Sequence, residues 1–224
     1  MSTRKAALLA VGSFNPPTIA HLRMLETAKS HLETLNFQVC EGIMSPVADS
    51  YNKKSTVVSA QHRFKMVSAA TKSSNWIRGD DWECTRPTWT RTLAVLKHHL
   101  EGVRQKHGAE TCLFLVVGGD VVDSFPRILP DGSNLWNADD ILKIIMDFGL
   151  IVISRDGATP LQTCQAMPTI CHVADRITIL EDQVLPNLIS STRLRQAILA
   201  RKSIKYATPD DVIDYIRENN LYAA

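Results

Sequence analysis

Short apolar runs alternate along the chain with longer stretches in which apolar residues return every three or four positions. The short runs predict buried strands, and the periodic stretches predict amphipathic helices. Strands are expected at residues 6–11, 37–44, 76–77, 112–117, 150–153 and 177–180. Helices are expected near residues 22–32, 60–72, 93–103, 138–147, 191–201 and 209–219, with a long polar loop at 45–59. This alternation is typical of an α/β fold.

Five or six strands alternating with helices predict a Rossmann-like, doubly wound sheet that is mostly parallel and has helices on both faces. No repeat, low-complexity tract or linker divides the chain, so we expect a single domain over residues 1–224. In such sheets ligands bind beyond the carboxyl ends of the strands. A site is therefore expected just after Val11, Met44, Val117 and Ile153.

The composition excludes several classes of protein. Hydrophobic residues make up 45% of the 224 residues and charged residues 21%, as in ordinary globular proteins. The 25 Lys and Arg against 23 Asp and Glu leave a formal charge of +2, too small to hold nucleic acid or an anionic membrane by field alone. The longest apolar runs, 6–11 and 112–117, are far shorter than the roughly 18 residues of a membrane span. We expect neither nucleic acid nor membrane as a partner.

The five cysteines indicate a reducing environment. They are widely spaced and form no CxxC pair, so neither a disulfide framework nor a zinc site is predicted. The apolar stretch after Arg4 and Lys5 ends at Gly12 without the small-residue cleavage site of a signal peptide. We therefore expect an intracellular protein of the cytoplasm, the nucleus or both, with no metal site built from its own side chains.

A first candidate for chemistry is the segment 12–21, which joins the first expected strand to the first expected helix. It reads Gly-Ser-Phe-Asn-Pro-Pro-Thr-Ile-Ala-His. Gly12 lets a ligand approach the backbone, and the helix start offers unpaired N–H groups that suit a phosphate. His21 would lie beside that phosphate. An ordinary turn with a surface histidine is the alternative.

A second candidate is the segment 189–195, which opens a late helix with the sequence Ile-Ser-Ser-Thr-Arg-Leu-Arg. Hydroxyl groups and arginine at a helix start form an anion site, because the guanidinium can donate to two phosphate oxygens. Arg193 and Arg195 are two positions apart and point to nearly opposite sides of the helix. A capped helix with a basic face is the alternative.

The two segments together identify a family. The sequence resembles the eukaryotic nicotinamide/nicotinate mononucleotide adenylyltransferases of the HxGH-type nucleotidylyltransferase superfamily, which join a mononucleotide to ATP, form NAD and release pyrophosphate. The resemblance spans nearly the whole chain. It is carried by residues 12–23, 42–54, 92–99, 118–120, 134–136, 149–155, 187–195 and 203–222.

The resemblance implies a role for each matching residue. ATP would be bound by His21, Gly118, Asp120, Asn187, Thr192, Arg193, Leu194 and Arg195. The mononucleotide, and NAD as the product, would contact Gly12, Ser13, Phe14, Lys53, Trp89, Thr92, Leu135, Trp136 and Arg155. The catalytic residues would be His21, Lys53 and Arg195, with Arg195 preferred over Arg193 as the arginine of the motif.

Some positions depart from the family pattern. Thr18 occupies the position of the superfamily's first histidine and Ala20 that of its glycine, although threonine is usual at the former in eukaryotes. Leu188 replaces an acidic residue that relatives often carry. The segment 107–111 lacks the long basic insertion of nuclear relatives, and 126–133 is longer than usual, which indicates a modified pocket rim.

The chemistry of the reaction fits these residue types. The attacking 5′-phosphate has a second pKa of about 6, so it is mostly dianionic at pH 7 and needs no strong base. The resemblance implies Mg²⁺ held mainly by the ATP phosphates and water, and we expect no covalent enzyme intermediate. The expected partners are ATP and nicotinamide or nicotinate mononucleotide, and homo-oligomers stay open.

Two other functions stay open at this point. One is an adenylyltransferase for another phosphorylated substrate such as pantetheine phosphate, which Trp89 and Trp136 disfavour because a pyridinium ring is the cation that their rings attract. The other is a non-catalytic nucleotide-binding or chaperone-like protein on the same fold. The presence of His21 and Arg195 disfavours it.

Overall fold

The computed structural model describes residues 3–51, 57–154, 157–185 and 189–223. The chain divides into two compact units, each assembled from separate stretches of sequence. Unit 1 contains Met1–Leu9, Met24–Cys40 and Arg91–Asn187. Unit 2 contains Ala10–Arg23, Glu41–Thr90 and Leu188–Ala224.

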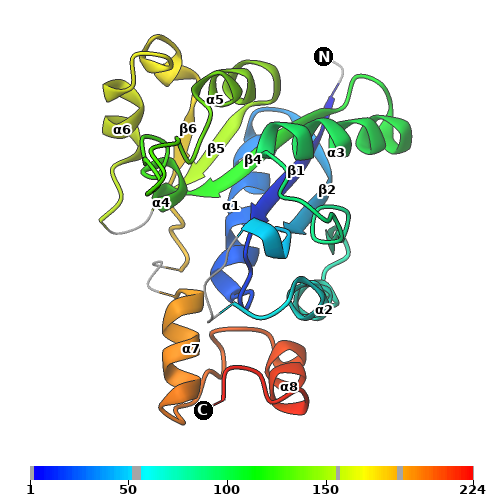
Figure 1. Ribbon diagram of the computed structural model, residues 1–224. Helices are drawn as coiled ribbons and strands as arrows, with labels where there is room; N and C mark the ends of the chain where they lie inside the picture. Colours follow the sequence, from blue (N-terminus) through cyan, green and yellow to red (C-terminus); the bar gives the residue numbers. More distant parts are fainter. Residues whose placement is uncertain (1–2, 52–56, 155–156, 186–188, 224) are drawn as a thin grey trace. The chain divides into compact units, whose positions relative to one another are not determined.

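Within the described residues, six strands form one sheet in the order β3-β2-β1-β4-β5-β6 (Figure 1). They are β1 (Arg4–Gly12), β2 (Phe37–Pro46), β3 (Ile77–Gly79), β4 (Cys112–Gly118), β5 (Leu150–Ile153) and β6 (Thr178–Leu180). The pairs β1/β4, β2/β3, β4/β5 and β5/β6 are parallel. The strand order runs outward in both directions from β1 and β4, as in doubly wound sheets. The predicted α/β fold is confirmed.

Unit 1 is built on the part of β1 up to Leu9 and on β4, β5 and β6. Ala6 pairs with Cys112 and Leu9 with Leu115, and every residue of β5 is buried. Continuous apolar runs suit strands that are covered on both faces. The helices that lie wholly in this unit are α3 (Thr92–His107), α4 (Gly119–Val122), α5 (Ala138–Lys143) and α6 (Pro160–Ala166). Most of α1 (Ile19–Thr34) also belongs here, with a π-helical turn (Ile144–Phe148) and a 3-10 helix (Cys171–Arg176).

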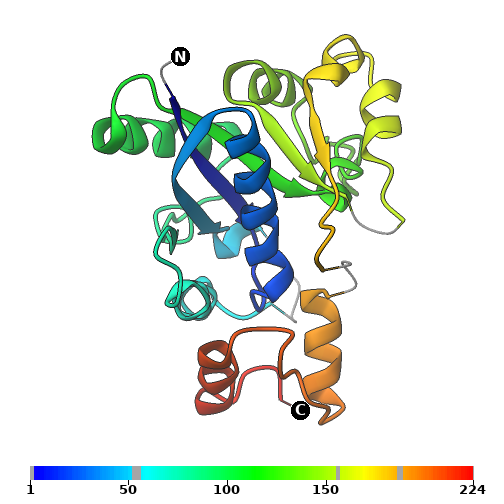
Figure 2. The ribbon, with the colours of Figure 1, turned by 180° about the vertical axis from the view of Figure 1, so that it is seen from behind.

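Unit 2 contains the other helices, which pack through a shared apolar cluster. They are α2 (Ala60–Thr71), α7 (Ser191–Leu199) and α8 (Asp210–Glu218), together with a 3-10 turn (Asp49–Tyr51). Met66 of α2, Leu194 of α7 and Val212 of α8 are among the buried residues of the cluster. Figure 1 shows α2 beside α8, and Figure 2 shows the chain turning back between α7 and α8. Three amphipathic helices thus bury one another's apolar faces.

The structure corrects several expected elements. The predicted loop at 45–59 begins later, because β2 continues to Pro46, and a 3-10 turn occupies Asp49–Tyr51. The expected helix at 138–147 is α-helical only to Lys143 and then widens into the π-helical turn. Neither α4 nor α6 was predicted, since each is too short to show a period. Among the described residues, none of the helices combines the length and the apolar character that crossing a membrane requires.

A glycine after the π-helical turn gives a test of the fold. Gly149 has a φ of +97°, and a Cβ there would lie 2.7 Å from Cδ1 of Phe114. Gly149→Ala should therefore lower the free energy of unfolding by about 2–4 kcal/mol, from backbone strain and overpacking together. Urea unfolding measures this loss. Gly157→Ala is the control, because Gly157 has a φ of +82° but nothing within 4 Å. Equal losses in the two variants would contradict the packing argument.

Candidate active site

The loop of residues 12–18, which follows β1, is held through its carbonyl groups. Groups from later parts of unit 2 donate hydrogen bonds to five of them. Before and within α2, the Val47 N–H donates to Gly12 O at 3.0 Å and Arg63 Nη1 donates to Ser13 O at 3.1 Å. From α7 and the segment after it, Arg195 Nη1 donates to Asn15 O at 2.7 Å, Ser191 Oγ to Pro16 O at 2.7 Å and Thr208 Oγ1 to Pro17 O at 2.8 Å. Each donor offsets the negative partial charge of a carbonyl oxygen, which reduces the repulsion that an anionic ligand meets at this loop.

Phe14 gives the loop its sharp turn. Its φ is +45°, a left-handed conformation that non-glycine residues adopt at a cost. The side chain is 3% exposed, and its ring meets the ring of His21 edge-on with 5.2 Å between the centroids. Strain of this kind persists only where the surroundings impose it, and it is common at ligand sites.

His21 is oriented by Thr18. The backbone N–H of Thr18 donates to His21 Nδ1 at 3.0 Å, and Thr18 Oγ1 lies 2.8 Å from the same nitrogen. A backbone amide can only donate, so Nδ1 is an acceptor and the neutral ring carries its proton on Nε2. Thr18, at the position of the superfamily's first histidine, therefore orients the catalytic candidate His21, and sequence reasoning missed this role.

The second junction, at the start of α7, contacts the first loop directly. Ser190 caps the helix by accepting from the Arg193 N–H at 3.3 Å, as its sequence predicts. Besides its bond to Asn15 O, Arg195 donates from Nη2 to Thr192 Oγ1 at 3.3 Å. Thr192 and Arg193 are exposed, whereas the Leu194 side chain is buried in the apolar cluster. At the start of α7, Leu194 thus packs into the apolar cluster while the adjacent Arg195 contacts the loop.

Unit 1 holds another set of predicted residues. Gly118 precedes α4 and Asp120 is exposed in its first turn. Trp136 is half-buried, and its indole Nε1 donates to Ser124 Oγ at 3.0 Å while its ring meets Phe125 edge-on at 5.0 Å. These contacts hold the indole against neighbouring side chains of unit 1.

The other predicted residues are placed as follows. Gly12 and Ser13 lie in the loop that follows β1, in unit 2. Trp89 also belongs to unit 2, and it is 41% exposed. Thr92 begins α3 and Leu135 precedes Trp136, both in unit 1. Lys53, Arg155 and Asn187 lie outside the described residues, as does Leu188.

Arg63 is a residue of the site that sequence reasoning missed. Its side chain is 1% exposed and donates to Ser13 O, to Val58 O at 3.1 Å and to Val47 O at 2.7 Å, and it pairs with Asp49 at 3.0 Å. A buried guanidinium is stable only when its donors are satisfied, so Arg63 joins the first loop to the segments before α2. The available signal was its place in the apolar stripe of α2, among Ala60, Met66, Val67 and Ala70.

Glu83 is a second missed residue. The carboxyl is 2% exposed, and Ser45 Oγ donates to its Oε2 at 3.0 Å. Burial raises the pKa of Glu83 to about 8, against the opposing effects of Ser45 and the positive charge of Arg63. Ser45 is the last residue but one of β2, so this buried pair lies at the strand's carboxyl end.

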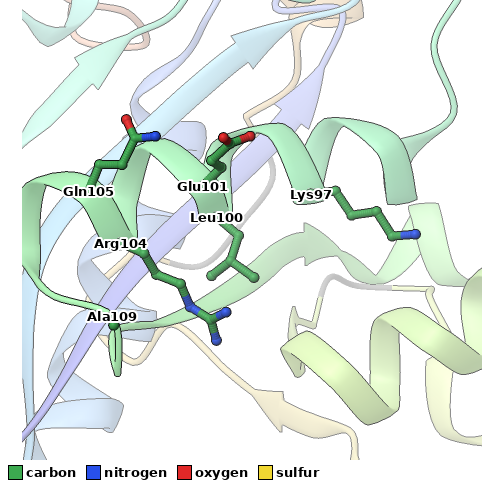
Figure 3. A pocket seen from close by; sticks show the side chains of 6 residues that line it. All are labelled: Lys97, Leu100, Glu101, Arg104, Gln105 and Ala109. Atoms are coloured by element: carbon green, nitrogen blue, oxygen red, sulfur yellow. The ribbon is translucent and has the colours of Figure 1, made fainter.

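Two surface hollows were also found in the described residues. One of about 480 Å³ lies along α3 and is lined by Lys97, Leu100, Glu101, Arg104, Gln105 and Ala109 (Figure 3). The other, of about 560 Å³, lies in unit 2 between the start of α2 and residues 81–85. Of the predicted site residues that the structure describes, none lines either hollow. No group of three or more His, Cys, Asp or Glu side chains in the described part of the chain is placed to hold a metal ion.

The pKa of Glu83 gives a prediction about stability. A carboxyl whose folded pKa is raised from 4.5 to about 8 stabilises the fold fully below pH 4.5 and loses that contribution as the pH rises to about 8. Between pH 5 and pH 9 the wild type should lose about 2–4 kcal/mol more of its unfolding free energy than Glu83→Gln. Urea unfolding at each pH measures it, with the exposed Asp81→Asn as control. Parallel pH profiles for wild type and Glu83→Gln would refute the raised pKa.

Comparison with known proteins places these motifs in context. Residues 9–197 match the family described as cytidylyltransferase-like. The chain is 67% identical over 219 residues to nicotinamide/nicotinic acid mononucleotide adenylyltransferase 2 of Caenorhabditis elegans, covering 98% of each. It is 34% identical to nicotinamide/nicotinic acid mononucleotide adenylyltransferase 1 of Bos taurus, covering 98% of this chain and 89% of that protein. The solved nicotinic acid mononucleotide adenylyltransferase of Plasmodium falciparum complexed with NaAD has a TM-score of 0.66, 21% identity and 98% coverage of both chains, a likeness of fold.

Proposed function

The chain belongs to the eukaryotic nicotinamide/nicotinic acid mononucleotide adenylyltransferases, and on this premise we propose that it transfers the AMP moiety of ATP to nicotinamide mononucleotide. Nicotinate mononucleotide is a second acceptor. The products are NAD, or deamido-NAD, and pyrophosphate. The observation that carries the proposal is the contact between the two helix starts, in which Arg195 and Ser191 of α7 donate to the loop of residues 12–18, just before the helix that carries His21.

The reaction is a direct in-line displacement. The 5′-phosphate of the mononucleotide, mostly dianionic at pH 7 with its second pKa of about 6, attacks the α-phosphorus of ATP without a general base. The bond to pyrophosphate breaks as the new P–O bond forms, and no covalent enzyme intermediate arises. What the protein contributes is the alignment of two polyanions and stabilisation of the charge that moves onto pyrophosphate.

His21 and Arg195 provide that stabilisation, together with Lys53. With Nδ1 occupied by Thr18, His21 presents Nε2–H as a neutral hydrogen-bond donor to the ATP phosphates. Arg195 and the backbone N–H groups at the start of α7, flanked by Thr192, Arg193 and Leu194, bind the ATP tail. Lys53 binds the phosphate of the mononucleotide.

Magnesium is the expected cofactor. The ion would be bound mainly by phosphate oxygens and water, because Mg²⁺ prefers oxygen ligands and usually keeps several waters when it binds nucleotides. When bound, Mg²⁺ neutralises phosphate charge and polarises the α-phosphate. Asp120 and Gly118 contact the ATP ribose, and Asn187 completes the ATP site.

The nicotinamide ring is a delocalised cation, and the tryptophans suit it. Trp89 and Trp136 attract such a ring by about 0.5–2 kcal/mol, with Thr92 and Leu135 beside it and Arg155 at the nucleotide. Gly12, Ser13 and Phe14 face the mononucleotide through their backbone. The whole chain of residues 1–224 works as one catalytic domain. It works inside the cell, in the cytoplasm or nucleus, where its five cysteines stay reduced.

Replacing His21 tests the proposed function. His21→Ala should lower the turnover about 100-fold or more, because one preorganised donor to the phosphates is lost. The measurement is NAD formation from nicotinamide mononucleotide and ATP with Mg²⁺, with circular dichroism to show that the fold persists. His31→Ala, on the same helix, is the control and should keep full turnover. An active His21→Ala enzyme would remove His21 from the mechanism.

Replacing Trp89 tests the mononucleotide pocket. Trp89→Leu should raise the KM for nicotinamide mononucleotide about 2- to 30-fold and leave the KM for ATP unchanged, because the attraction between the indole and the pyridinium is lost. Trp89→Phe should recover most of the affinity, since an aromatic face remains. Steady-state kinetics with each substrate varied in turn give both constants. An unchanged mononucleotide KM in Trp89→Leu would exclude Trp89 from the pocket.

A further inference from the structure

Asn15 lies at the centre of the first loop and is held on both its backbone and its side chain. Its carbonyl oxygen accepts from Arg195 Nη1 at 2.7 Å. Its side-chain Oδ1 accepts from the Tyr222 hydroxyl at 2.6 Å and from the Val58 N–H at 3.3 Å. Since a backbone N–H can only donate, the atom that it contacts is the amide oxygen, and the orientation of the amide is defined. Asn15 is 2% exposed, so water cannot replace these partners at low cost.

Tyr222 comes from the other end of the sequence. Its hydroxyl is 3.9 Å from Met66 Sδ, and its ring packs against the apolar cluster of α2, α7 and α8. Burial raises the pKa of the Tyr222 hydroxyl, so its proton stays on the oxygen at neutral pH. The hydroxyl therefore acts as the donor and Asn15 Oδ1 as the acceptor. This short bond fixes the side chain of Asn15, and the backbone carbonyl of the same residue accepts from Arg195.

The neighbouring part of the C-terminal segment supports the same loop. Thr208 Oγ1 donates to Pro17 O at 2.8 Å, and Ala207 O accepts from the Ile19 N–H at 3.0 Å. Residues 207–222 thus contact the first loop and the start of α1 at several points, while α8 between them lies in the apolar cluster. The hydrogen bond of Tyr222 is the one contact among these that reaches the residue bonded to Arg195.

We infer that Tyr222 is a positioning residue for Arg195, acting through Asn15. The inference rests on the proposed function, in which Arg195 stabilises charge on the ATP phosphates. Without the hydroxyl, Asn15 Oδ1 loses the shorter of the two bonds described above, and the position of the Asn15 peptide is less constrained. Arg195 then loses its fixed acceptor at a site where displacements of about 1 Å can cost 100-fold in rate.

The first test compares two tyrosine variants. Tyr222→Phe should lower kcat about tenfold and leave the KM for nicotinamide mononucleotide unchanged within about twofold, because the change acts through Arg195. Tyr215→Phe is the matched control, because its hydroxyl lies at the edge of the same cluster and contacts His62 Nδ1 of α2 at 3.0 Å. Melting temperatures of both variants record the purely structural cost. Equal kcat values in the two variants would overturn the inference.

The second test asks whether the effect passes through Arg195. In a double-mutant cycle, Tyr222→Phe should change kcat by less than about twofold once Arg195→Ala is present. A general loosening of the fold would instead lower kcat by the same factor in both backgrounds, and that result would overturn the inference. The affinity for Mg²⁺-ATP, measured by calorimetry in the same four proteins, should show the same dependence on Arg195.

The affinity measurement also separates this inference from the proposed function. A wild type that binds Mg²⁺-ATP but forms no NAD would refute the proposed function. The positioning role would then be decided by ATP affinity alone. A loss of affinity in Tyr222→Phe only when Arg195 is present would support it, and no loss would overturn it. Hydrogen exchange of peptides covering residues 10–23 should be faster in Tyr222→Phe than in Tyr215→Phe.

Discussion

The loop of residues 12–18 needs hydrogen-bond donors that it cannot supply itself. It turns through Phe14 at positive φ, and Pro16 and Pro17 have no N–H groups, so the loop can join neither a helix nor a strand ladder. Asn15, Pro16, Pro17 and Thr18 are all buried, and buried carbonyls must be paired. Arg195, Ser191 and Thr208 donate to the carbonyl groups of Asn15, Pro16 and Pro17. Arg63 donates to that of Ser13, and the Thr18 carbonyl accepts from the His21 N–H. The shape of the proposed phosphate site in this loop therefore depends on α2, on α7 and on the segment that contains Thr208.

The apolar cluster of unit 2 holds the helices that carry these hydrogen-bond donors in place. Leu194 and Arg195 are adjacent in α7, and the leucine is buried in the cluster while the guanidinium reaches Asn15. Arg63 holds the same relation in α2, where Met66 enters the cluster one turn away. Hydrophobic packing thus fixes the position of both guanidinium groups. Because the helices are already held in place, only the side chains of Arg63 and Arg195 need to be ordered to contact the loop. This limits the conformational entropy lost when the site forms.

The sequence predicts the repeating parts of the fold well and the irregular parts poorly. Buried strands such as β4 and β5 are continuous apolar runs, and α1 and α3 show a clear period, so their positions follow from hydrophobicity alone. The short helices α4 and α6 do not, because Gly119 and Pro160 mark turns as readily as helix starts. The π-helical turn after Lys143 depends on packing at Phe148 and Gly149.

The same division applies to the site. His21 and Arg195 follow from their places at two helix starts and from the family resemblance. Asn15 and Glu83 do not, because their importance lies in contacts with residues far away in the sequence, which no local pattern encodes. Arg63 is intermediate, since a charge within an apolar stripe is visible in the sequence but its acceptors are not.

The distances along the sequence between bonded residues have a consequence for biosynthesis. The bonds from Ser191, Thr208 and Tyr222 to the first loop join residues separated by 175, 191 and 207 positions. A nascent chain can pair β1 with β4 when little more than half of this sequence has been made, but its loop of residues 12–18 still lacks those partners. Loops that wait for distant contacts stay open to wrong pairings. During the later part of its synthesis the chain therefore has β1 and β4 in place while the loop of residues 12–18 still lacks these partners, and in that interval a chaperone would find exposed loop and cluster residues to protect.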